Sequence, residues 1–208
     1  MRRRALLVLA AAATAIAALP WRVMAAERIP TPRQTRGPFY PVDIPEDKDN
    51  DLVRVRGADG IAKGEITLLT GTVTDLGGKP LAGARVEIWQ CDANGRYHHP
   101  GDGSSMPLDP NFQGYGEFTT GADGTYRFRT IKPVPYPGRT PHIHFQVNAP
   151  GMRTLVTQMY IAGFPGNDRD GVLAGIRDPQ ARESVLVPFA MLPDGSALAA
   201  RFDLVMSG

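Results

Sequence analysis

Two histidines on one predicted strand, His142 and His144, are the first residues in this 208-residue sequence whose spacing indicates chemistry. In an extended strand, residues i and i+2 point to the same face, about 7 Å apart along the chain. The two imidazoles therefore share one side, whereas Ile143 and Phe145 face the other side and can enter a core. Two imidazoles on one face form half of a metal site, although an ordinary polar strand face shows the same pattern.

The residues that could complete such a site are tyrosines. The chain has a single cysteine, Cys91, which excludes internal disulfides and multi-cysteine zinc or iron–sulfur sites. Tyr136 lies six residues before His142, between prolines that stiffen the loop and orient the phenol. Tyr97 follows an Asn-Gly turn at the end of a predicted strand. For both tyrosines, the alternative is a buried ring with a hydrogen-bonded hydroxyl.

The elements that must position these side chains are short strands separated by turns. Alternating or β-branched runs between turn residues predict strands over residues 66–74, 84–90, 116–120, 126–131, 142–147, 155–161, 184–192 and 197–206. Asp-Gly pairs predict a hairpin turn at 123–124 and a link between the last two strands at 194–195. Only residues 170–177 are expected to form a short helix. We expect an all-β fold, a β-sandwich of antiparallel strands with an irregular N-terminal arm and long loops around the site.

The first 26 residues resemble an export signal. Three arginines precede an alanine-rich apolar run over residues 5–19, and small residues follow at 23–26. This is the layout of a secretory signal peptide, and the run is too short to span a membrane. The arginines also resemble a twin-arginine signal, while an uncleaved amphipathic anchor is the alternative. We therefore expect an exported protein, periplasmic or extracellular, whose mature form has no membrane segment.

The charge balance excludes a nucleic-acid partner. The whole chain has a net charge of +2, but residues 1–26 contain four arginines and no acidic residue. The remaining chain has 19 basic and 21 acidic residues and no basic cluster that could follow a phosphate backbone. The predicted organisation is an export signal at 1–26, an N-terminal arm at 27–62 and a sandwich domain at 63–208.

Four motifs occur in order around these candidate residues: WQCDANGRY at 89–97, DPNFQGYG at 109–116, YRFRTIKPVPYP at 126–137 and RTPHIHF at 139–145. Together they closely resemble the intradiol ring-cleavage dioxygenases, the family of protocatechuate 3,4-dioxygenase and catechol 1,2-dioxygenase. The resemblance extends from residue 66 to residue 203. Residues 31–41 (TPRQTRGPFYP) look like the N-terminal arm of that family.

The resemblance implies a non-haem Fe(III) centre. Its ligands would be two tyrosinates and two histidines, which map onto Tyr97, Tyr136, His142 and His144. Phenolate is a hard anionic donor suited to a trivalent cation, whose charge lowers a phenol pKa that is normally about 10. The implied reaction inserts both atoms of O2 into a catechol-type aromatic substrate. It cleaves the ring between the two hydroxyl-bearing carbons and gives a muconate-type diacid.

The same resemblance assigns catalytic roles to three residues. Tyr136 would take up a proton of the incoming catechol. Arg139 matches an arginine that stabilises charge developing on the substrate, and Gln158 matches a glutamine that supports the site. The alternative for Arg139 is a surface salt bridge, and for Gln158 a cross-strand hydrogen bond.

One departure from the family concerns the substrate. Residues 136–142 form a shorter loop than in the familiar members and lack the tryptophan that lines their pocket, which predicts a more open pocket. All four expected ligands lie on one chain, so the resemblance allows a homo-oligomer. The alternative function is a non-catalytic β-sandwich binding module at the cell surface or in the periplasm, which has no need for all four ligands. A zinc or copper enzyme would require carboxylates or cysteine that the motifs do not provide.

Overall fold

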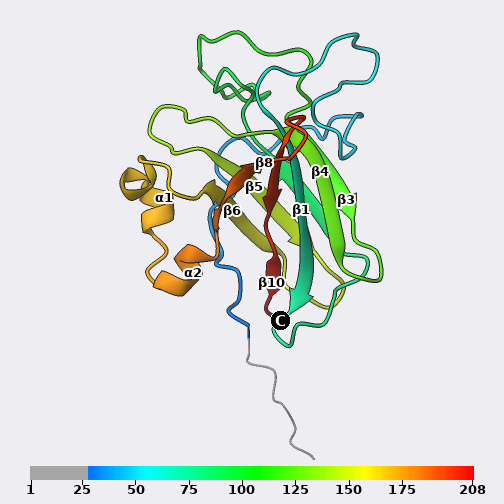
Figure 1. Cartoon of the computed structure of the whole chain (residues 1–208), viewed down its shortest axis with the longest axis vertical. Helices are drawn as coiled ribbons and strands as arrows, with labels where there is room; N and C mark the ends of the chain where they lie inside the picture. The colour runs from blue at the N-terminus through cyan, green and yellow to red at the C-terminus, as the bar shows by residue number, and fades with distance from the viewer. Residues whose placement is uncertain (1–27) are drawn as a thin grey trace, which may run out of the picture.

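Residues 28–208 are described by a computed structural model of the chain, and the export signal predicted over 1–26 lies outside them (Figure 1). The strands are β1 (Ile66–Asp75), β2 (Arg85–Trp89), β3 (Tyr115–Thr119), β4 (Thr125–Ile131), β5 (His142–Asn148), β6 (Leu155–Ile161), β7 (Leu186–Val187), β8 (Phe189–Met191), β9 (Leu198–Arg201) and β10 (Leu204–Met206). The helices are a 3-10 turn, η1 (Asn167–Arg169), and two short α-helices, α1 (Gly171–Ala174) and α2 (Pro179–Glu183).

The strands form two sheets that pack face to face, which confirms the all-β sandwich. One sheet has the order β3-β2-β5-β6-β7, and the other has the order β10-β1-β9-β8 with β4 also paired to β1. Both sheets are mixed rather than purely antiparallel, because β1 runs parallel to β9 and β10 and β6 runs parallel to β7. The core between them includes Leu69, Val73, Ile88, Phe128, Ile143, Phe145 and Val147.

Two predicted strands are each broken into two. Residues 184–192 divide at Pro188, which has no N–H for a ladder; β7 before it joins one sheet and β8 after it joins the other. Residues 197–206 divide into β9 and β10, which follow the same long strand β1. Between them the carboxylate of Asp203 accepts a hydrogen bond from the Thr72 amide at 2.8 Å, in place of a backbone carbonyl.

The two Asp-Gly pairs have different outcomes. At 194–195 the pair connects the antiparallel strands β8 and β9, as predicted. At 123–124 the chain does turn, and Gly124 has φ +69°. However, β3 pairs with β2 and β4 pairs with β1, so this turn joins the two sheets and the predicted hairpin is wrong. A type I′ turn also needs a positive φ at the aspartate, and only glycines have one among residues 28–208.

Side-chain caps define both α-helices. The predicted helix at 170–177 is present but shorter, because only Gly171–Ala174 are α-helical. Asp170 caps it by accepting from the amides of Val172 and Leu173. Helix α2 was not predicted, although Asp178 caps it in the same way and Pro179 occupies its first turn.

The arm at 28–62 contains no strand; in Figure 1 its blue part passes beside β6 and its cyan part forms loops at the end of the sandwich opposite the C-terminus. The Thr31 amide donates to the carbonyl of Val205 at 3.0 Å, and the Gln34 amide donates to the carbonyl of Val156 at 2.8 Å. Leu52, further along the arm, is fully buried in the core between the sheets. The arm is thus packed against the strands that carry the candidate site.

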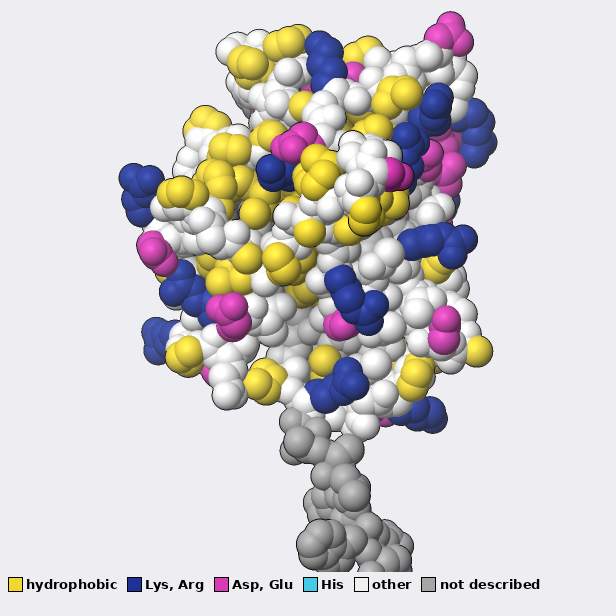
Figure 2. All heavy atoms as spheres, viewed as in Figure 1, with side chains coloured by type: hydrophobic (Ala, Val, Ile, Leu, Met, Phe, Trp, Pro, Cys, Tyr) yellow, Lys and Arg dark blue, Asp and Glu magenta, His cyan; other side chains and the backbone are white. Residues whose placement is uncertain are grey.

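On the face drawn in Figure 2, lysines and arginines alternate with acidic side chains and form no single basic patch. This distribution agrees with the nearly balanced charge of the sequence after residue 26. Within residues 28–208, no helix combines the length and hydropathy that crossing a bilayer requires.

Candidate metal centre

The two histidines of β5 face each other inside the protein. The Nε2 atoms of His142 and His144 are 3.2 Å apart, and each residue has only 1% of its surface exposed. Ile143 and Phe145 point the other way and are fully buried in the core. The alternation of the strand therefore delivers both imidazoles to one side, as the sequence predicts.

The hydrogen bond of His142 to Thr140 and the burial of both histidines leave Nε2 of His142 unprotonated. Its Nδ1 lies 2.6 Å from the carbonyl oxygen of Thr140, which can only accept, so Nδ1 carries the proton. Burial lowers the pKa of His142 to about 4. Burial also lowers the pKa of His144 well below its usual value, and this ring stacks on Trp89 with centroids 4.8 Å apart. Both imidazoles are neutral at ordinary pH, which is the form that binds metals.

Tyr97 reaches the pair from the loop that follows β2. Gly95 has the positive φ of +74° that the tight turn before Tyr97 requires. The carboxylate of Asp102 accepts a hydrogen bond from the Tyr97 amide at 2.7 Å. The phenol oxygen lies 3.4 Å from Nε2 of His142. Phe39 of the arm stacks on the tyrosine ring, with centroids 4.6 Å apart. Tyr97 is therefore held in place by Asp102 at its backbone, by Phe39 at its ring face and by His142 at its hydroxyl.

Tyr136 is held by a turn between β4 and β5. The Arg139 amide donates to the Tyr136 carbonyl at 2.9 Å, and Gly138 has φ +82°. Proline followed by a glycine with positive φ is the pattern of a type II turn, so Pro137 and Gly138 determine this geometry. The ring of Tyr136 is half-buried and lies 5.5 Å from that of His142, centroid to centroid. Tyr136 is the more exposed of the two tyrosines.

Arg139 is held in the site by three neighbours. Its Nε donates to the Asp170 carboxylate at 2.9 Å, its Nη2 donates to Oε1 of Gln158 at 2.6 Å, and its Nη1 lies 3.5 Å from the Tyr136 phenol oxygen. Its side chain is 15% exposed. The salt-bridge alternative for Arg139 therefore holds in part, but the pair is buried in the site rather than on the surface.

Gln158 connects the site to the N-terminal arm. It lies opposite His144 in the β5–β6 ladder. Its backbone amide donates to the side chain of Gln34 at 2.9 Å, and its Nε2 donates to the carbonyl of Thr35 at 3.0 Å. Its Oε1 accepts from Tyr160 at 3.1 Å as well as from the arginine. The side chain of Gln158 is thus bound to the arm, to Arg139 and to Tyr160 on its own strand, rather than across to β5 as in the alternative.

The four donor side chains suit a small, highly charged cation. Donor atoms bound to one ion at about 2.0–2.2 Å lie about 3 Å from their neighbours, close to the 3.2 Å and 3.4 Å separations around Nε2 of His142. Burial raises the pKa of Tyr97 well above its usual value, so the phenolate needs a nearby positive charge. Within residues 28–208, no three His, Cys, Asp or Glu side chains gather into a metal-binding group. The site therefore depends on the tyrosines.

Comparison with known proteins identifies the family. The sequence model of a family described as Dioxygenase matches residues 35–208. The chain is 41% identical over 194 residues to the protocatechuate 3,4-dioxygenase beta chain of Burkholderia cepacia, an alignment that covers 86% of this chain and 82% of that protein. The chain belongs to the intradiol dioxygenase family. It is an oxidoreductase of this class, and ring cleavage of catechol-type compounds is the activity its relatives support.

Other relatives of this intradiol dioxygenase differ in size. Hydroxyquinol 1,2-dioxygenase of Corynebacterium glutamicum is 33% identical over 197 residues, which cover 82% of this chain but 62% of that enzyme. The dioxygenase domain of a carbohydrate-binding fusion protein from Streptomyces sp. SirexAA-E has a similar structure, with a TM-score of 0.66 and 34% identity. It covers 85% of this chain and 97% of that domain. The match to the family model, over residues 35–208, spans all ten strands of the sandwich.

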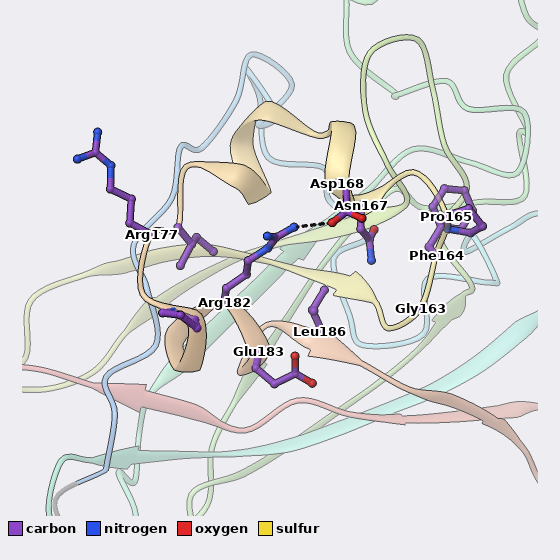
Figure 3. Close-up of a pocket in the computed structure, with 11 residues that line it drawn as sticks. Gly163, Phe164, Pro165, Asn167, Asp168, Arg177, Arg182, Glu183 and Leu186 are labelled. Atoms are coloured by element: carbon purple, nitrogen blue, oxygen red, sulfur yellow. Dashed lines mark hydrogen bonds and ion pairs between the residues drawn. The ribbon is translucent and has the colours of Figure 1, made fainter.

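Two hollows reach Tyr136 of the intradiol dioxygenase from outside. One, of about 600 Å³, is lined by Phe39, Pro137 and the loop 102–106. The other, of about 190 Å³, is lined by Arg139, Phe164 and Arg169. A third hollow, of about 540 Å³ beside α2, contains an ion pair between Arg182 and Asp168 but none of the candidate ligands (Figure 3). The candidate centre is thus bordered by these two hollows at Tyr136, and a smaller hollow of about 120 Å³ borders Tyr97.

Sequence reasoning missed several residues that hold this site. Asp170 was predicted only as the start of a helix, yet its buried carboxylate contacts Arg139 and Thr140. Burial alone would raise the pKa of this carboxyl, but hydrogen bonds from Leu173 and Thr140 and the charge of Arg139 lower it overall. An aspartate before a short apolar turn does indicate a helix cap. Nothing local indicates a partner 31 residues away in the chain.

Proposed function

We propose that this chain is an exported, non-haem Fe(III) intradiol dioxygenase that cleaves a catechol-type ring between its two hydroxyl-bearing carbons. The proposed iron ligands are Tyr97, Tyr136, His142 and His144. The observation that carries the proposal is the convergence of two phenols with two neutral, buried imidazoles, beside a fixed guanidinium. Two phenolates would neutralise much of the charge of a ferric ion, and a hydroxide the rest.

When bound, ferric iron would draw electron density from a chelated catecholate and make its ring reactive toward O2 without an added reductant. Tyr136 is placed to act as a base, because it is the more exposed phenol and borders both hollows. Burial raises the pKa of Tyr136, so its phenolate would depend on the charge of the ferric ion; as the phenolate, its Oη can accept a proton from an incoming catechol hydroxyl. The guanidinium of Arg139, 3.5 Å from that oxygen, stabilises the negative charge that this transfer leaves on the substrate.

The remaining residues keep these groups fixed. The Thr140 carbonyl holds the tautomer of His142 that leaves Nε2 unprotonated. Gln158 accepts from Nη2 of Arg139 and is itself bound to the arm. In the overall reaction both oxygen atoms of O2 enter the product, one carbon–carbon bond breaks and a muconate-type diacid is formed.

Oxygen uptake by the purified protein tests the proposal. The protein should be red-brown when it contains iron, because phenolate-to-Fe(III) charge transfer absorbs visible light. Catechol, protocatechuate and hydroxyquinol are then added in turn, since the names of the relatives include enzymes for each. We expect O2 consumption and a ring-opened diacid with at least one of them. A colourless protein that stays inert after reconstitution with ferric iron would contradict the proposal.

A non-catalytic binding module gains no support from the molecule. Such a module has no use for a buried arginine aimed at a pair of phenols and imidazoles, and the relatives are named as enzymes. The iron-binding enzyme is therefore the function that we propose.

Export is the second part of the proposal and rests on the arginines and the apolar run of residues 1–26. The twin-arginine route carries folded proteins, so iron could be bound before export. Replacing both Arg3 and Arg4 with lysine and fractionating the cells tests that route. Retention of the protein in the cytoplasm supports it, and undiminished export contradicts it.

A further inference from the structure

The carboxylate of Asp170 is fully buried, and its two oxygens serve different parts of the molecule. Oδ1 accepts from the amides of Val172 and Leu173, both at 3.0 Å, and so caps helix α1. Oδ2 accepts from Nε of Arg139 at 2.9 Å and from the Thr140 amide at 3.0 Å. Capping alone needs only the first oxygen. The second oxygen binds two residues beside the candidate metal centre.

We propose that Asp170 is a positioning residue for ring cleavage, an inference that rests on the function proposed above. Through Oδ2 it fixes Arg139, whose other nitrogens reach Gln158 and the Tyr136 phenol. A charged carboxylate paired with the arginine also keeps the guanidinium from turning toward bulk water. Asp170 lines the smaller hollow beside Tyr136, but its carboxylate hydrogen-bonds to Arg139 and Thr140 and to none of the four candidate ligands. It therefore acts through these two residues.

A second connection runs from Asp170 to His142. The Thr140 amide is bound by Asp170, and the carbonyl of the same residue accepts the Nδ1 proton of His142 at 2.6 Å. By holding Thr140 in place, Asp170 also holds the carbonyl that determines which nitrogen of His142 carries the proton. One buried carboxylate thus orients both the arginine and one of the imidazoles.

Asp170→Asn separates capping from positioning. The amide oxygen of asparagine can still cap α1, but its NH2 group then faces the N–H donors of Arg139 and Thr140 and cannot accept from them. Asp178→Asn is the matched control. Asp178 caps α2 by accepting from the amides of Gln180 and Ala181, and its side chain has no bond to the candidate site.

The variants are compared with the wild-type enzyme by three measurements: steady-state kinetics with the best catechol, the visible spectrum with ferric iron, and amide hydrogen exchange of the iron-free proteins. We expect Asp170→Asn to lower kcat/KM about 10–100-fold, mainly through kcat. We also expect a shifted charge-transfer band and faster exchange at the Thr140 amide. Asp178→Asn should resemble the wild type in all three.

Equal effects of the two substitutions, or wild-type values for Asp170→Asn, would overturn the inference. An inactive, iron-free wild type would instead contradict the proposed function, so the two failures are distinguishable. If Asp170→Asn does not fold, the double variant Arg139→Gln, Asp170→Asn removes the unpaired charge. Compared with Arg139→Gln alone, the double variant should still show faster exchange at the Thr140 amide, and no difference between them would refute the link to His142.

Discussion

His142 and His144 point their Nε2 atoms at each other from one strand face, 3.2 Å apart and out of contact with solvent. His142 donates its Nδ1 proton to a carbonyl, so its Nε2 lone pair faces the second ring. Burial keeps both imidazoles neutral, and the phenol of Tyr97 lies 3.4 Å from the same Nε2. Two neutral imidazole nitrogens and a phenol oxygen held this close together form a donor set that one shared cation would bind.

Removing the metal should therefore destabilise the protein. A ligand that binds only the folded state, at 1,000 times its Kd, adds about 4 kcal/mol to the free energy of unfolding. For a chain of this size, that corresponds to a rise in Tm of roughly 10 °C on adding ferric iron to the iron-free protein. His144→Asn should abolish the rise, whereas replacement of the exposed His98 with Asn should preserve it. A rise that survives His144→Asn would place the iron elsewhere.

Tyr97→Phe removes one proposed oxygen ligand while keeping the ring that stacks on Phe39. We expect loss of much of the charge-transfer colour and a fall in kcat of about 100-fold or more. Tyr126→Phe is the control, because Tyr126 is equally buried but donates its hydroxyl to the Phe202 carbonyl in the other sheet. Visible absorption and O2 uptake are measured for both. Retained colour and activity in Tyr97→Phe would refute the ligand assignment.

Local patterns in the sequence were enough to predict most of the strands and the histidine pair. Alternation fixes which side chains of β5 share a face, and this rule does not depend on the partner strand. The same patterns could not show that the turn at Asp123 joins two sheets, because a turn does not specify with which strands its flanks pair. Pairing partners are decided by packing between residues far apart in the chain.

In the candidate site too, some features could be predicted from the sequence and others depend on long-range packing. The resemblance supplied Tyr97 and Arg139, but the groups that hold them come from distant segments. Phe39 of the arm lies against Tyr97, and Asp170 binds the arginine from the residue before α1. Such contacts depend on how the arm and the helix pack on the sheet, which no local spacing encodes.

Arg139→Lys should lower activity although it preserves the positive charge. The guanidinium reaches Asp170, Gln158 and Tyr136 with three different nitrogens, and a single ammonium group cannot reproduce that fork. We expect kcat to fall about 10²–10³-fold, comparable to the loss of a charge-stabilising donor in other active sites. Arg177→Lys, at the hollow beside α2, serves as the control and should leave kcat unchanged. A wild-type kcat for Arg139→Lys would show that charge alone suffices.

Gly37→Ala tests whether the arm presses on the metal centre. Gly37 has φ +70°, and a Cβ there would lie 3.1 Å from Cε1 of the His144 ring. The matched control is Gly57→Ala, which has φ +83° and nothing within 4 Å of the new Cβ. Both substitutions place alanine in the left-handed region and should cost about 1–2 kcal/mol of stability, measured by urea unfolding.

Only Gly37→Ala should also change the iron site, because the His144 ring or the arm must move by a few tenths of an ångström to admit the methyl group. We expect a lower iron content and a reduced kcat/KM for this variant. Gly57→Ala should bind iron and turn over like the wild type, despite a similar loss of stability. If the two variants lose activity in parallel, backbone strain explains the effect, and the arm does not position His144.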